Sequence, residues 1–253
     1  MNPEKISALV RHGAIKPEHV SLMVSHLNNW DPDKEEDSKA YEKKTVAYGS
    51  ALRDLSKGSS DQHVLSRIGN LDPHSESLYT NKINSNIAGN ENTPSDVLHS
   101  LAKRDDHYFG TITKNPNLSP EHAHDLITSL PDVTDARKIH WLASRGNLKP
   151  ESNDHLLSMM KDSSLYHQAH SYVLGRMAQQ PNLSAEHQNK IYDKAKELTK
   201  TTSFSGFDAI GHLAAHPKLD HGLAKRIATD FKGDDDMEHI LSNNRDLPPG
   251  FMK

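Results

Sequence analysis

The stretch Asn115-Pro116-Asn117-Leu118-Ser119-Pro120-Glu121-His122 has the composition of a joint at which one helix ends and another begins. Pro116 has no N–H to donate and restricts the residue before it to extended backbone, so a preceding helix must stop there. Ser119 is a good N-cap, Pro120 suits the first helical position, and Glu121 favours the positive end of the helix dipole. We therefore expect a tight turn between two helices.

Weaker copies of this joint recur along almost the whole chain. We name the residue equivalent to Leu118 the joint residue, and the copies give Ile15, Leu71, Thr93, Leu118, Leu148, Leu183, Leu219 and Leu247. The last five lie 30, 35, 36 and 28 residues apart. An apolar joint residue can fold back onto the helix residue five positions later. That receiving position is apolar at Val20 and Ala123. It is polar at Asn153 and Gln188, so this contact is only partly realised.

Each interval between joints holds two apolar stripes at helical spacing. One interval contains Leu156, Leu157 and Met160 and then Tyr172, Val173 and Met177. Two helices per ~30 to 40 residues is the range of an α-solenoid. No run alternates convincingly with period two, so we predict essentially no sheet. The sequence therefore predicts an all-α fold, an α-solenoid of irregular two-helix repeats.

The N-terminal part is the least repeat-like. We predict an atypical helical capping unit over residues 1–69, with an inserted helix that begins at Ser38, and a helical repeat array over residues 70–253. The two parts are expected to form one elongated domain. The apolar fraction of 34% is below the usual ~45 to 50%, which fits helices that each bury only a narrow stripe.

Composition excludes several classes of function. The 30 basic and 34 acidic residues are interspersed and give a net charge of -4, which argues against a dedicated nucleic-acid binder. The absence of cysteine excludes disulfides and thiolate chemistry. No stretch approaches ~20 consecutive apolar residues, and the N-terminus lacks the pattern of a signal peptide. We expect a soluble protein that is made in the cytoplasm.

At its joints the sequence resembles short α-helical repeats of the leucine-rich repeat variant type, which are HEAT-like and begin with Asn-Pro-Asn-Leu-Ser-Pro-Glu. Residues Asn115 to Glu121 match best, and Gln180 to Glu186 match next best. The iron–sulfur domain of that family needs cysteine ligands, so it has no counterpart here. Similar degenerate repeats occur in large tailed-phage proteins. The resemblance implies a virion structural protein or a phage accessory protein.

The 18 histidines raise the question of a metal site. Five of them occupy joint positions, where we expect solvated first-turn residues: His19, His74, His122, His187 and His221. The sharpest metal candidate is Asp208, His212 and His216, whose spacing of four and four would align three ligands on one helical face. Against it, His216 precedes Pro217, which favours extended backbone at that point. We predict no metal site and no cofactor.

Catalytic motifs are missing from the sequence. It contains no Gly-x-Ser-x-Gly nucleophile motif, no P-loop pattern and no Gly-x-Gly-x-x-Gly. The acidic run Asp234 to Asp236 is expected to be a solvated turn or a helix start. We therefore predict that the protein is not an enzyme.

The two tryptophans differ in setting. Trp141 lies beside Ile139 and Leu142 in a helical stripe, where burial is expected. Trp30 lies in a charged loop and is a candidate anchor for a partner protein.

The leading hypothesis is a non-enzymatic helical-repeat scaffold for protein–protein interaction, in a phage particle or as a phage accessory protein. The alternative is a nucleic-acid-binding protein that resembles helical-repeat DNA glycosylases. That alternative requires basic side chains gathered on one face, and the dispersed candidates are Arg11, Lys103, Arg104, Lys114, Arg137, Lys138, Arg145, Arg176, Lys225 and Arg226. The identity of the partner and the oligomeric state stay open.

Overall fold

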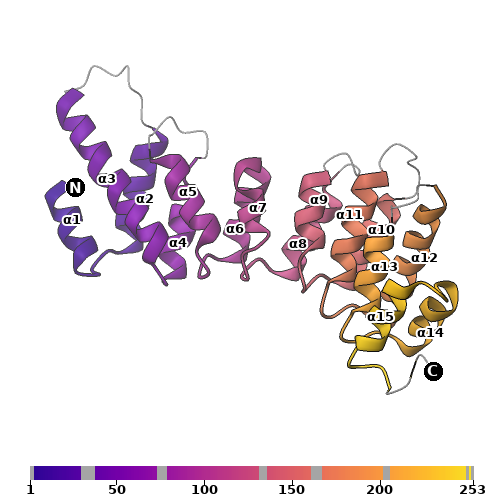
Figure 1. Ribbon diagram of the computed structural model, residues 1–253. Coiled ribbons are helices and arrows are strands. Elements are labelled where there is room, and N and C mark those ends of the chain that lie inside the picture. The colour runs from indigo at the N-terminus through magenta and orange to yellow at the C-terminus, as the bar shows by residue number, and fades with distance from the viewer. Residues whose placement is uncertain are drawn as a thin grey trace. The chain divides into compact units, whose positions relative to one another are not determined.

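The computed structural model describes residues 3–29, 38–72, 79–130, 136–160, 167–201, 206–248 and 251 (Figure 1). Every regular element in these residues is a helix, which confirms the all-α prediction. The elements in chain order are α1 (Pro3–Arg11), α2 (Pro17–Asn28), α3 (Ser38–Gly58), α4 (Gln62–Ile68), α5 (Thr80–Gly89), α6 (Ser95–Arg104), the 3-10 turn η1 (Asp106–Tyr108), α7 (Phe109–Ile112), α8 (Pro120–Thr128), α9 (Ala136–Ala143), α10 (Pro150–Met159), α11 (His167–Ala178), α12 (Ala185–Thr201), α13 (Phe207–Ala214), α14 (His221–Asp230) and α15 (Asp235–Asn243). None of these helices combines the length and the apolar character that crossing a lipid bilayer requires.

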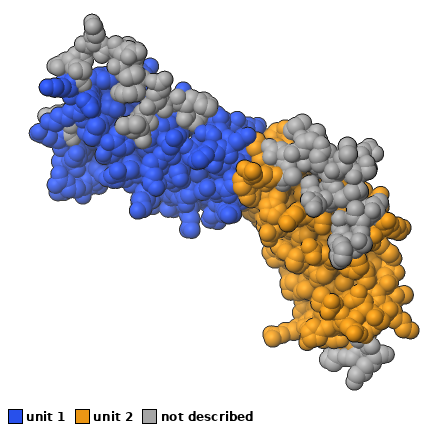
Figure 2. All heavy atoms as spheres, turned by 45° about the horizontal axis from the view of Figure 1, so that its top comes forward, with its two compact units in different colours: residues 1–122 blue, residues 123–253 orange. Residues whose placement is uncertain are grey.

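The chain divides into two compact units, residues 1–122 and residues 123–253, which have different colours in Figure 2. The capping unit predicted over residues 1–69 lies within unit 1. Helix α4 ends just before Gly69 and packs against α2 and α3, which precede it in the chain, and against α5, which follows it. The division between the two units falls within α8.

Within each unit the helices pack in two series. In unit 1, α1 packs against α3, α3 against α5 and α5 against α7, while α2 packs against α4. In unit 2, α9, α11, α13 and α15 form one series, which we name the odd layer. Helices α10, α12 and α14 form the other series, which we name the even layer. Contacts between neighbouring helices, such as α11 with α12 and α12 with α13, join the two layers.

The joints have the structure that their residue types predict. Leu118 is fully buried. Other buried joint residues are Leu71, Thr93, Leu183, Leu219 and Leu247, whereas Ile15 and Leu148 are half-buried. Ser119 Oγ accepts a hydrogen bond from His122 N at 3.2 Å, and Asp220 Oδ1 accepts one from Leu223 N at 2.8 Å. Both side chains therefore satisfy N–H groups that the first turn of a helix leaves without an intrahelical partner.

A second feature of the joints depends on the residue three positions before the joint residue. Asn115 Nδ2 donates to the carbonyl oxygens of Ala88 and Asn90, at 2.9 and 3.0 Å, which belong to the preceding joint. Asn115 Oδ1 accepts from Asn117 N at 2.9 Å, within its own turn. One buried amide thus closes its own turn and binds the backbone of the turn before it.

The same position makes the same kind of contact at other joints. Asn244 Nδ2 donates to the carbonyl oxygens of Ala214 and His216 at 2.7 and 3.0 Å, and its Oδ1 accepts from the N–H two residues later. Gln180 Nε2 donates to Ala143 O at 3.0 Å. We name these side chains the bridge residues: Asn90, Asn115, Gln180, His216 and Asn244.

Buried amide side chains also bind the joints from a second position. This position lies in the helix that follows a joint, five residues after the joint residue. Gln188 Nε2 donates to Lys218 O and Gln188 Oε1 accepts from Asp220 N, both at 2.8 Å, so one side chain pairs with the backbone on both sides of a joint residue. Asn153 pairs with Gln180 through amide contacts of 3.2 and 3.3 Å. Asn153 and Gln188 are the positions where an apolar receiving residue is missing from the sequence. Both are buried because their polar atoms bind other buried polar groups.

One buried amide of unit 1 contrasts with the bridge residues. Asn84 on α5 is 1% exposed, and neither its Nδ2 nor its Oδ1 has a hydrogen-bond partner among the residues that the structure describes. A buried polar group without a partner costs about 1 to 3 kcal/mol. Asn84 and Asn115 are thus the same side chain, buried in the same unit, with opposite hydrogen-bonding states.

We predict that Asn115→Ala lowers the free energy of unfolding by about 2 to 3 kcal/mol. The substitution removes three hydrogen bonds to backbone groups of a buried joint, those of Ala88, Asn90 and Asn117. Urea denaturation followed by far-UV circular dichroism measures the change.

Asn84→Leu is the matched control. We expect it to raise the free energy of unfolding by about 1 kcal/mol, because an apolar group of similar volume replaces an amide that lacks hydrogen bonds. Equal destabilisation by Asn115→Ala and Asn84→Leu would contradict the role of Asn115 as a bridge residue.

Candidate functional site

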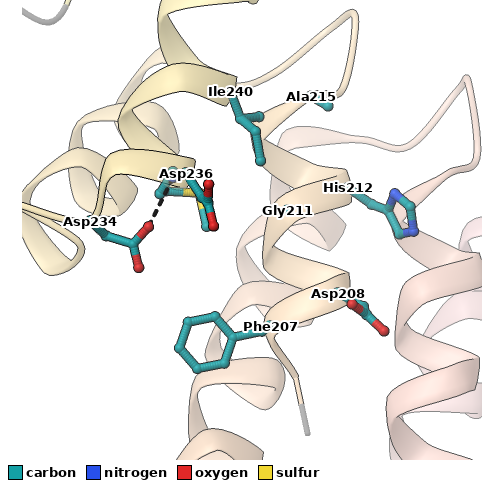
Figure 3. A pocket seen from close by; sticks show the side chains of 9 residues that line it. Phe207, Asp208, Gly211, His212, Ala215, Asp234, Asp236 and Ile240 are labelled. Carbon is teal, nitrogen blue, oxygen red and sulfur yellow. Dashed lines mark hydrogen bonds between the residues drawn. The ribbon is translucent and has the colours of Figure 1, made fainter. Parts of the chain in front are cut away.

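Helices α13 and α15 of the odd layer border a surface groove of about 640 Å³ (Figure 3). Its lining residues are Phe207, Asp208, Gly211, His212, Ala215, Asp234, Asp236, Met237 and Ile240. They all come from these two helices and from the residues that directly flank them. The groove therefore has two walls, one from each helix.

The groove exists partly because Gly211 has no side chain. A Cβ atom at Gly211 would lie 3.9 Å from Ile240 Cδ1, which is an ordinary van der Waals distance. Packing therefore leaves room for alanine at this position. Glycine inside a helix is about 1 kcal/mol less favourable than alanine, so this position is less stabilising than it could be.

Phe207 forms the start of the α13 wall. It is 39% exposed, and its ring meets the ring of Phe231 edge-on with centroids 5.6 Å apart. Gly206, directly before it, has a φ of +103°, which L side chains rarely adopt. A Cβ atom there would come within 2.3 Å of Ala195 O, so only glycine fits. This turn fixes where α13 begins and keeps Phe207 at the surface.

Acidic side chains lie on both walls of the groove. Asp208 belongs to α13, whereas Asp234 and Asp236 belong to the start of α15 (Figure 3). Asp234 Oδ1 accepts a hydrogen bond from Met237 N at 3.0 Å and so caps α15. None of the lining residues is Lys or Arg. The groove therefore combines an apolar floor with acidic edges.

The proposed metal ligands Asp208, His212 and His216 do not come together as a metal site. Asp208 and His212 line the groove. His216 is 2% exposed, and both ring nitrogens bind backbone groups: Nε2 donates to Gln180 O at 2.9 Å and Nδ1 accepts from Lys218 N at 3.0 Å. The part of the chain that the structure describes contains no group of three His, Asp or Glu side chains placed to hold a metal ion. His216 is a bridge residue.

Among the histidines at the joints, His221 is exposed as expected, whereas His19 and His122 are half-buried and His187 is buried. His187 is 4% exposed, so the expectation of a solvated side chain is wrong there. Its Nδ1 lies 2.8 Å from Ser184 Oγ and its Nε2 lies 3.3 Å from Asp154 Oδ1. His122 is half-buried and stacks on His99 with ring centroids 4.5 Å apart. These rings pack between helices because each lies in a first turn that faces a neighbour.

His74 and Trp30 lie outside the described residues, so the structure does not place the predicted partner anchor. Trp141 is half-buried.

The odd layer of unit 2 exposes aromatic side chains that the sequence pattern does not mark as exposed. Tyr172 on α11 was expected in a buried stripe, but it is 67% exposed, and its ring meets that of His140 on α9 edge-on at 6.1 Å. Phe207 on α13 is also exposed. The buried residues of α11 include Val173, Leu174, Met177 and Ala178, which recur at the spacing of one helix face. Tyr172 lies one position before this stripe, and that offset is the signal that could have placed it at the surface.

The even layer of unit 2 presents paired charges instead. Lys190 Nζ lies 2.7 Å from Asp154 Oδ1 and 2.6 Å from Glu186 Oε1. Arg226 lies 2.6 Å from Asp193 Oδ1. Exposed pairs of this kind contribute little to stability, because water and salt screen their attraction. Their main consequence is that a partner covering this layer would have to remove water from many charges.

Two partly buried histidines respond to pH. His26 Nε2 lies 2.9 Å from Thr45 Oγ1, and the ring packs between Tyr41 and Tyr48. Burial lowers the pKa of His26, and the charge of Lys44 lowers it further. Burial, and then the charge of Arg176, also lower the pKa of His140. The folded state therefore binds fewer protons at these sites than the unfolded chain does.

Comparisons of the chain with protein-family models, with curated proteins and with solved structures found no match.

We predict that the protein loses stability as the pH falls from 7 to 5. The unfolded chain takes up protons at histidine near pH 6.5, whereas burial and the neighbouring charge of Lys44 oppose protonation of His26 in the folded state. His26→Gln should reduce the loss in melting temperature over this range, because glutamine does not titrate. His63→Gln, at an exposed position, is the control. The same pH dependence in His26→Gln and in the unsubstituted protein would contradict this role of His26.

We also predict that Gly211→Ala raises the free energy of unfolding by about 0.5 to 1 kcal/mol, since alanine is the better helix former and the nearest atom, Ile240 Cδ1, is at contact distance. Urea denaturation measures the change. A loss of stability would show that the floor of the groove has no space for a side chain.

Proposed function

We propose that this protein is a non-enzymatic α-solenoid that acts as a scaffold for protein–protein interaction, and that the odd layer of unit 2 is its binding face. The observation that carries the proposal is the contrast between the two layers. The odd layer exposes Tyr172, Phe207 and an apolar groove, whereas the even layer presents paired charges.

The bridge residues support the repeat architecture. Each binds at least one backbone carbonyl oxygen near the end of an earlier helix, so contacts pass from one helix pair to the next. Stability that depends on neighbouring repeats is the defining property of solenoid proteins. Such arrays offer extended surfaces built from successive helices, which suits the recognition of another protein.

Exposed aromatic side chains support the choice of face. Tyr and Phe are enriched at protein interfaces, where they bury a large area with few rotatable bonds. Tyr172 is the most exposed large apolar side chain among the described residues, and its position on α11 puts it in the same layer as the groove between α13 and α15.

The nucleic-acid alternative is weaker because several of its basic side chains already have structural partners. Arg104 donates to the carbonyl oxygens of Gly69 and Leu71 at 2.7 and 3.3 Å. Arg145 is buried, and Arg226 pairs with an aspartate. A phosphate-binding surface needs basic side chains free to contact phosphate, and these three are held by the fold.

The resemblance to repeats of tailed-phage proteins suggests the setting of the scaffold. We include in the proposal a role as a structural protein of a phage particle or as a phage accessory protein.

Site-specific photo-crosslinking tests the proposed face. We predict that p-benzoylphenylalanine in place of Tyr172 crosslinks one reproducible protein in extracts of the native source. The same residue in place of Glu186, which lies on the even layer, should not. Mass spectrometry identifies the crosslinked species. Crosslinks of equal yield from both positions, crosslinks to nucleic acid, or no reproducible protein would contradict the proposal.

A further inference from the structure

We propose that the groove between α13 and α15 binds a short segment of the partner protein, with one apolar anchor side chain flanked on both sides by Lys or Arg. This inference rests on the proposed function and names the partner chemistry that the odd layer recognises. Three properties of the groove carry it: its floor, its open form and the charge of its edges.

The floor provides a place for one apolar side chain. Gly211 contributes no side chain, and Ile240 and Phe207 stand on either side of it (Figure 3). Phe207 is 39% exposed although its ring already contacts Phe231, so part of its apolar surface is open to a ligand. An apolar side chain seated over Gly211 would cover the surfaces of both walls at once. Anchors of this type dominate the affinity of protein interfaces.

The form of the groove favours a peptide segment over a small molecule. Its volume of about 640 Å³ is within the range of ligand sites. Small-molecule sites, however, enclose most of the ligand surface. Here the lining comes only from α13 and α15 and the residues directly flanking them, so a chain can enter at one end and leave at the other. A peptide segment that binds between two helices needs a groove that is open at both ends.

The charge of the edges selects a basic segment. Asp208 and Asp236 are exposed on opposite walls, and Asp234 lies beside Asp236. None of the lining residues supplies a compensating Lys or Arg. Positive side chains before and after the anchor would meet a carboxylate on each wall, whereas acidic flanks would be repelled. Charge thus adds specificity to the contact that the floor provides.

The inference can be tested with three fluorescein-labelled peptides of equal length and the full chain. The first has a central Leu flanked by Lys, the second the same Leu flanked by Glu, and the third a central Ser flanked by Lys. We expect the first to bind, with a fluorescence anisotropy change that weakens as NaCl is raised. The second and third should bind at least about tenfold more weakly.

Substitutions locate the binding in the groove. Gly211→Met fills the floor, and Asp208→Asn combined with Asp236→Asn removes charge from both walls. Each should weaken binding of the first peptide by about tenfold or more. Glu151→Gln, at an exposed acid on α10 of the even layer, should leave the binding unchanged. Thermal melting of every variant confirms that it is folded.

Three results would overturn the inference: equal binding of the Lys-flanked and Glu-flanked peptides, undiminished binding by folded Gly211→Met, or no binding of any peptide. These results leave the crosslinking at Tyr172 as a separate test of the scaffold function. A protein crosslinked at Tyr172 whose capture is unaffected by Gly211→Met would preserve the function and reject the groove as its site.

Discussion

The hydrogen bonds of the bridge residues are the contacts that join helix ends far apart in the sequence. A helix end leaves carbonyl oxygens without intrahelical partners, and a joint between two helices concentrates such groups in a buried place. Asn115 resolves this by binding two carbonyl oxygens of the preceding joint while closing its own turn. The apolar fraction is only 34%, so each helix has a narrow apolar stripe. Hydrogen bonds from amide side chains at fixed positions therefore help to determine where the helix ends lie. A small apolar core determines this less strongly.

Local chemistry made much of the fold predictable. The joints, the N-cap at Ser119 and the burial of Leu118 follow from residues close together in sequence, and the structure confirms them. Contacts between residues far apart in the sequence were not predictable in the same way. Gln188 looked like a defect in an apolar pattern because its partners, Lys218 and Asp220, lie some thirty residues away. The sequence pattern marks such a side chain only as polar, and polarity alone suggests the surface.

The candidate site shows the same limit more strongly. The groove requires α13 and α15 to be neighbours, and the residue spacing within a single helix does not predict which helix packs beside it. Spacing predicted Asp208, His212 and His216 on one helical face, but α13 ends at Ala214. Both ring nitrogens of His216 bind backbone groups, Nε2 that of Gln180 and Nδ1 that of Lys218 in its own turn. Tyr172 failed as a core prediction for a related reason. Tyr172 was assigned to a buried stripe because its side chain is largely apolar, but an exposed tyrosine has the same apolar character.

The bridge residues differ in length while they do the same work. Asparagine serves in unit 1 at Asn90 and Asn115, whereas glutamine and histidine serve in unit 2 at Gln180 and His216, before asparagine returns at Asn244. Glutamine is one methylene longer than asparagine and so reaches a more distant carbonyl group. A residue change at this one position can therefore accommodate a different distance between two helix ends without any change in the helices themselves.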